Sequence, residues 1–212
     1  MSELTNTASL AITDAVVVLP DRVIERGSVG LRQGRIAEIS DSGVLQGSYD
    51  DEVDARSAYL VPGVIDLHND SLETEINPRP ESNLPLDFAL ATLERRLLAA
   101  GVTTEFHAIA FMNRANSGRS VSNAAYRSAY LAEYAASGRQ LIDNQVLHRI
   151  DVWSPEHLDA IFESVERLSM RYVSVNDHTP GQGQYRDLDA FKERMQAWVQ
   201  QRGRVALSLI HI

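Results

Sequence analysis

The sequence has no cysteine among its 212 residues. This absence excludes disulfides, thiolate nucleophiles and Cys-ligated zinc, and it leaves histidine and carboxylate side chains as the strong metal ligands. The chain also lacks a run of 18 apolar residues, and its first residues form neither a basic region nor an apolar leader. We therefore expect a cytoplasmic protein that neither spans a membrane nor is secreted.

Positive charge is scarce and is carried almost entirely by arginine. The 20 Lys and Arg residues face 29 Asp and Glu residues, a net charge of −9, and Lys192 is the only lysine. A negative chain lacks the basic surface that nucleic acid binding requires, so we expect no nucleic acid partner. Arginine grips phosphate and carboxylate groups with a planar fork, which makes individual arginines candidate contacts to an anionic ligand.

Short strands and tight turns fill the first part of the chain. Residues 16–19 form a buried-type apolar run, and residues 28–39 read as a hairpin around Gln33 and Gly34. Pro62 and Gly63 then punctuate the chain. These signals predict a small N-terminal β module over residues 1–61.

Beyond this point strand-like and helix-like segments alternate, which predicts parallel β/α units over residues 62–212. The expected strands cover residues 64–68, 102–111, 145–153, 171–176 and 205–212, and the expected helices cover residues 86–97, 121–136, those after 154–156, and 188–198. A complete (β/α)8 barrel takes about 250 residues, so the segment accommodates four to five units. The periodicity fits either a partial barrel or an open doubly wound sheet.

The first strand ends in a cluster of ionisable side chains. Asp66, His68 and Asp70 occupy alternate positions, and strand side chains alternate between two faces, so the three are expected to point the same way. The carboxyl ends of parallel strands are where ligands bind in barrels and open sheets. Imidazole and carboxylate both suit zinc or manganese, so this cluster is a candidate metal site.

A second polar cluster follows the fourth expected strand. His178 could bind a metal or move a proton, and the glycine-containing loop with Gly181 and Gln182 offers backbone N–H groups for phosphate oxygens. A plain β-to-α connection explains the same loop equally well.

In the second and third expected strands, alternation decides which polar side chains share a face of the sheet. Alternation lets either His148 or the pair Arg149 and Asp151 face the interior, and we favour the pair, with His148 as a structural histidine under the helices. Glu105 and His107 share a face on the second strand; either could support a metal ligand from behind, and we favour satisfied polar core residues.

The segment from Leu60 to Asp70 resembles the start of the barrel in the amidohydrolase superfamily, where a small β module and a Pro-Gly turn precede a metal-binding His-x-His or a variant. Three motifs resemble its alpha-D-ribose 1-methylphosphonate 5-triphosphate diphosphatase branch, of the carbon–phosphorus lyase pathway. They are His68-Asn69-Asp70, Asn77-Pro78-Arg79-Pro80 and Asp177-His178-Thr179-Pro180-Gly181-Gln182, with residues 100–104 as a weaker fourth.

The resemblance implies a partial TIM-type (β/α) barrel and a metal-dependent hydrolase that releases pyrophosphate from a phosphorylated small molecule in phosphonate catabolism. It implies a divalent metal, zinc or else manganese, and it leaves room for a homo-oligomer. The site residues that it and the spacing single out fall into three roles: His68 and Asp70 as metal ligands, Asp151 and His178 in catalysis, and Arg79, Arg149, Gly181 and Gln182 in substrate binding.

Two departures from the branch bear on activity. Leu147 stands where the branch tends to have a histidine, and His211 is one place away from the family's fifth-strand ligand. We therefore expect an incomplete barrel, with the general base and remaining ligands beyond residue 212 and with weak or no activity. Alternatives are an amidohydrolase acting on a cyclic amide or an amino-purine, and an inactive chain that serves as a binding or assembly partner.

Overall fold

The computed structural model describes residues 9–79, 82–113, 119–152, 157–168 and 170–202. The chain forms two compact units, Met1–Gly63 and Val64–Ile212. The predicted strand at residues 205–212 and residues 154–156, after which a helix is predicted, lie outside the described residues. Within those ranges, no helix is both long and apolar enough to cross a membrane.

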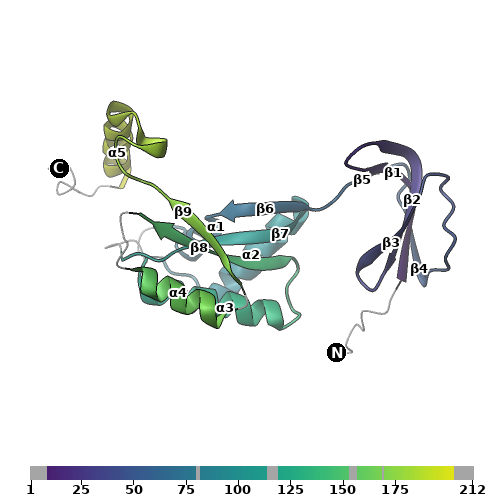
Figure 1. Cartoon of the computed structure of the whole chain (residues 1–212), viewed down its shortest axis with the longest axis horizontal. Coiled ribbons are helices and arrows are strands. Elements are labelled where there is room, and N and C mark those ends of the chain that lie inside the picture. The colour runs from purple at the N-terminus through teal and green to yellow at the C-terminus, as the bar shows by residue number, and fades with distance from the viewer. Residues whose placement is uncertain (1–8, 80–81, 114–118, 153–156, 169, 203–212) are drawn as a thin grey trace. The chain divides into compact units, whose positions relative to one another are not determined.

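The first unit is a five-stranded sheet (Figure 1). Its strands are β1 (Ser9–Val18), β2 (Val23–Arg32), β3 (Arg35–Ser40), β4 (Asp51–Asp54) and β5 (Tyr59–Leu60). The order is β3-β2-β1-β4, with β5 also paired to β1, and a small core includes Ala15 and Val17. The predicted hairpin is confirmed: Gln33 and Gly34, with φ of 52° and 70°, join β2 to β3 as the tight primed turn that suits twisted strands.

The second unit is a parallel sheet of β6 (Val64–Asn69), β7 (Val102–Ala110), β8 (Asp143–Asp151) and β9 (Tyr172–Asn176). Its strand order follows the chain, β6-β7-β8-β9. A doubly wound sheet reverses its order at a switch point, whereas a barrel adds each strand beside the last. The strand order therefore favours the partial barrel over the open sheet.

A helix follows each strand of this sheet (Figure 1). The helices are α1 (Ser71–Ile76), α2 (Leu86–Ala99), α3 (Val121–Ala136), α4 (Leu158–Arg167) and α5 (Leu188–Arg202), with a short 3₁₀ helix, η2 (Gly183–Tyr185), before α5. Of these, α1 to α4 pack against the strands of the sheet. The main core joins helix side chains to strand side chains: Leu90, Leu93, Leu131 and Ile161 pack with Ile109 and Val146. The helical spacing of leucines in α2 is thus confirmed as a buried stripe.

The sheet presents apolar side chains to solvent at both of its outer strands. Ile65 and Leu67 of β6 are 58% and 66% exposed, and Val175 of β9 is 68% exposed. Open strand edges with apolar side chains favour pairing with another chain. The homo-oligomer expected from the sequence stays a prediction.

Candidate active site

The carboxyl end of β6 contains a bulge. Asp66 pairs with Glu105 of β7 and Asn69 pairs with His107, so three steps on β6 match two on β7. Asp66 accepts hydrogen bonds from the backbone N–H of His68 (3.1 Å) and from the side-chain amide of Asn69 (3.2 Å). The predicted common face of Asp66, His68 and Asp70 is therefore wrong, because the extra residue interrupts the alternation.

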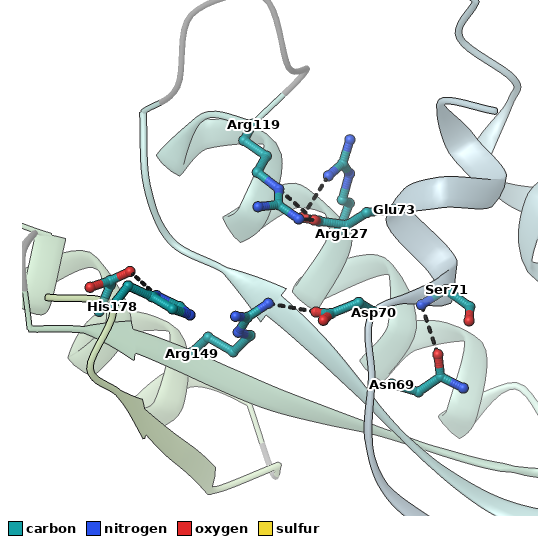
Figure 2. A network of polar contacts seen from close by, with 9 residues as sticks. Asn69, Asp70, Ser71, Glu73, Arg119, Arg127, Arg149 and His178 are labelled. Atoms are coloured by element: carbon teal, nitrogen blue, oxygen red, sulfur yellow. Dashed lines mark hydrogen bonds and ion pairs between the residues drawn. The ribbon is translucent and has the colours of Figure 1, made fainter. Parts of the chain in front are cut away.

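Asp70 lies just beyond the strand, at the N-terminal boundary of α1. Its carboxylate accepts a hydrogen bond from Nη1 of Arg149 at 2.5 Å, and the two side chains form an ion pair (Figure 2). The Arg149 side chain is 13% exposed and that of Asp70 is 51% exposed. A largely buried guanidinium from β8 thus reaches the first polar motif of the barrel.

The two faces of β8 divide its polar residues as predicted. His148 is fully buried, its Nε2 lies 3.0 Å from Oγ of Ser164 in α4, and its Nδ1 lies 3.1 Å from the carbonyl oxygen of Tyr172. Burial lowers its pKa, so the neutral imidazole is favoured. His148 is a structural histidine under the helix layer, and Arg149 and Asp151 occupy the other face.

Asp151 engages the second polar motif. Its Oδ2 lies 2.6 Å from Nδ1 of His178, the residue two places beyond the end of β9 (Figure 2). The ring of His178 also packs near the ring of Tyr185 in η2, with centroids 5.9 Å apart. A carboxylate on one imidazole nitrogen fixes the tautomer and orients the other nitrogen, an arrangement that suits proton transfer.

The loop after β9 is held together by its own backbone. Gly181 N–H donates to Tyr185 and Gln182 N–H donates to Thr179, and Gly181 takes a φ of 89°. The hydrogen bonds that Thr179 donates lower the pKa of Asp177. The two amides predicted to cradle phosphate are therefore already used within the loop. The side chain of Gln182 is exposed, as is that of Arg79.

A buried ion-pair cluster lies beside this site, and the sequence reasoning missed it (Figure 2). Glu73 of α1 binds Arg119 at 2.6 Å and Arg127 of α3 at 3.3 Å. Burial lowers the pKa of the Arg127 guanidinium, and Glu73 opposes this effect. The i, i+4 spacing of the apolar Leu72 and Ile76 is the one signal that could have revealed α1 and its buried acid.

Glu105 departs from the expectation of a satisfied core residue. It is fully buried, and among the described residues neither carboxyl oxygen has a partner at normal hydrogen-bond geometry, so that prediction is wrong. Burial, with the negative charge of Asp66 as the second cause, raises the pKa of Glu105 to about 7. The neighbouring His107 is half-satisfied: its Nε2 lies 2.8 Å from Asn144 Oδ1, and its Nδ1 has no partner in the part of the chain that the structure describes.

His68 and Asp70 carry the ligand atoms that a divalent metal accepts, an imidazole nitrogen and carboxylate oxygens. Their chemistry therefore fits such a metal. Among the described residues, no group of three His, Cys, Asp or Glu side chains is arranged to hold one. The metal-ligand roles of His68 and Asp70 accordingly stay predictions.

Comparison with known structures defines the class of fold. The chain matches an adenosine deaminase from Xanthomonas campestris with bound zinc, with a TM-score of 0.53 and 17% identity over 93% of this chain and 55% of that one. A crystal structure of an amidohydrolase matches with a TM-score of 0.50 and 15% identity, over 82% of this chain and 57% of that one. No protein-family model matches. At these identities the likeness shows the fold, and it confirms the partial barrel.

Comparison with curated proteins adds a particular relative. The chain is 27% identical over 189 residues to alpha-D-ribose 1-methylphosphonate 5-triphosphate diphosphatase of Escherichia coli (strain K12). The match covers 88% of this chain, and the chain spans about half, 48%, of that relative's length. The resemblance to the amidohydrolase superfamily and its diphosphatase branch, predicted from three short motifs, is confirmed.

Proposed function

We propose that the chain is a metal-dependent hydrolase of the amidohydrolase superfamily. We further propose that it acts on a phosphorylated small molecule and releases pyrophosphate by hydrolysing a phosphoanhydride. The observation that carries this proposal is the pairing on one face of β8. Arg149 binds Asp70 and Asp151 binds His178, so one strand brings both polar motifs of the sequence to one face.

His178 is the proposed proton-transfer group. With Nδ1 held by Asp151, its Nε2 is directed away from the carboxylate and can accept or return a proton during attack of water on phosphorus. Asp151 therefore positions the ring of His178.

Arg149 is the proposed contact for the substrate's phosphate groups. When bound by His68 and Asp70, a divalent metal would supply a Lewis acid and a more acidic water. Nη1 of Arg149 binds Asp70, and the guanidinium has further N–H groups that can bind an anionic substrate. The exposed Arg79 and Gln182 are further candidate contacts to the substrate, and Gly181 shapes the loop that carries Gln182.

The experiment measures pyrophosphate release from alpha-D-ribose 1-methylphosphonate 5-triphosphate with zinc or manganese present. Asp151→Asn is expected to lower kcat by about 10²-fold or more, with little change in KM, because His178 loses its orienting partner. Asp143→Asn, an exposed carboxylate at the opposite end of β8, is the matched control and should leave kcat unchanged.

Zinc binding by calorimetry tests the metal assignment separately. His68→Ala should weaken zinc binding at least about 10-fold, whereas Asp143→Asn should not. Unchanged zinc binding in His68→Ala contradicts the metal site, and unchanged kcat in Asp151→Asn contradicts the role of the Asp151–His178 pair. A native chain that releases ammonia from an amino-purine, and no pyrophosphate, would support the deaminase-type alternative.

A further inference from the structure

Two buried hydrogen-bond donors on the open face of the sheet have no partner among the described residues. They are Nε of Arg149 on β8 and Nδ2 of Asn176, the last residue of β9. In the pairing of these strands Arg149 lies opposite Ser174, and Asp151 lies opposite Asn176. Arg149 and Asn176 are therefore diagonal neighbours on one face, at the carboxyl ends of adjacent strands.

A buried donor without an acceptor destabilises a folded chain by about 1–3 kcal/mol, so natural proteins rarely keep two side by side without a role. Both orphaned groups are N–H donors, and one belongs to a cation. Asp151, which shares this face, is bound to His178, and Asp70 is bound through a different nitrogen of Arg149. The missing partner is therefore an acceptor, and the positive charge favours an anionic one.

We propose that Asn176 is a substrate-binding residue, and that it forms with Nε of Arg149 a two-donor receptor for one anionic oxygen of a phosphate group. That this phosphate belongs to the substrate rests on the function proposed above. The receptor itself rests only on the two buried donors and their register. Asparagine is disfavoured in strands, and its presence at this strand end fits a ligand contact better than a structural one.

Calorimetric titration of the metal-free chain with inorganic pyrophosphate tests the receptor. Asn176→Leu keeps the side-chain volume and removes the donor, so pyrophosphate binding should weaken about 10-fold or more. Asn176→Asp puts a negative charge at the same position and should weaken binding further. Gln145→Leu, an amide near the start of β8 that bonds Asp143, is the matched control and should bind as the native chain does.

Thermal unfolding separates this role from a structural one. Removing an unsatisfied buried donor should leave the Tm of Asn176→Leu unchanged or raised, whereas loss of a structural hydrogen bond would lower it. Pyrophosphate binding by Asn176→Leu equal to that of the native chain overturns the proposal and assigns the two donors to water. No binding by the native chain overturns it as well. Neither result depends on turnover, so the hydrolase proposal is judged apart from this one.

Discussion

The two faces of the β6–β9 sheet use polar side chains in different ways. On the helix-covered face, Glu94 of α2 accepts hydrogen bonds from Tyr134 (2.7 Å) and Asn144 (2.6 Å), and Asn144 in turn binds His107. On the opposite face, Arg149 and Asp151 bind residues that follow other strands. Polar groups on the first face tie helices to the sheet, and those on the second gather the two sequence motifs.

Neighbouring residues of one strand illustrate this division. His148 and Arg149 are adjacent in β8, yet the first is satisfied by Ser164 and the second keeps a buried donor without a partner. The comparison teaches that the strand's alternation separates structural polar groups from those proposed to bind a ligand. Changes on the covered side should therefore alter stability, whereas changes on the open side should alter binding.

The largest effect on stability is expected for Glu73→Gln. This change leaves the buried Arg127 and its neighbour Arg119 without their shared carboxylate, so the free energy of unfolding should fall by about 3–5 kcal/mol. Urea unfolding followed by circular dichroism measures it. Glu75→Gln on the same helix breaks the more exposed pair with Arg96 and should cost less than about 1 kcal/mol. Equal losses in the two variants would contradict the structural role of the Glu73 cluster.

Glu105 should make stability depend on pH. Its pKa is about 7 in the folded chain against 4.5 unfolded, so the folded chain binds the proton more tightly. The resulting stabilisation is complete below pH 4.5 and is lost as the pH rises to about 7, with a total on the order of 3 kcal/mol.

Glu105→Gln should remove this dependence, so the difference in unfolding free energy between variant and native chain should change across pH 4.5–7. Burial lowers the pKa of His107 and gives the opposite slope, but both proteins share that contribution. A difference that stays constant across this range would show that Glu105 is ionised in the folded chain.

A smaller effect is expected for Tyr134→Phe. Burial, with the hydrogen bond to Glu94 as the next cause, raises the pKa of Tyr134 to about 12, and removal of its hydroxyl leaves one oxygen of Glu94 without that donor. We expect a loss of about 1–2 kcal/mol by urea unfolding. Tyr126→Phe, on the same helix and 61% exposed, should be neutral. An unchanged free energy of unfolding in Tyr134→Phe would show that the hydrogen bonds from Asn144 and from the backbone N–H of Leu141 are sufficient for Glu94.

The sequence predicted the features that local signals determine. The turn at Gln33 and Gly34, the bounds of α3 and the burial of His148 follow from turn chemistry, helical spacing and strand alternation. Periodicity does not encode strand order, so it fits a partial barrel and a doubly wound sheet equally well. The order became visible only in the pairing of β6 with β7 and of β8 with β9.

Other features depend on tertiary packing and could not be read locally. The bulge in β6 requires the pairing of Asp66 and Asn69 with β7, so simple alternation failed there. Glu105 is orphaned because helices and neighbouring strands bury it, and nothing in its own segment signals that burial. For the site, the spacing indicated Arg149, Asp151 and His178, whereas Asn176 was missed because only its register opposite Asp151 brings it to them.

The bulge at the end of β6 changes which side chains share one face of the sheet. In a regular strand, His68 would share a face with Asp66. Because of the bulge, Asn69 shares that face instead. Deleting Leu67 would place Asn69 two positions after Asp66, so regular alternation would keep the two on one side of the sheet without a bulge. The one extra residue in this six-residue strand thus determines whether His68 or Asn69 lies on the same face as Asp66.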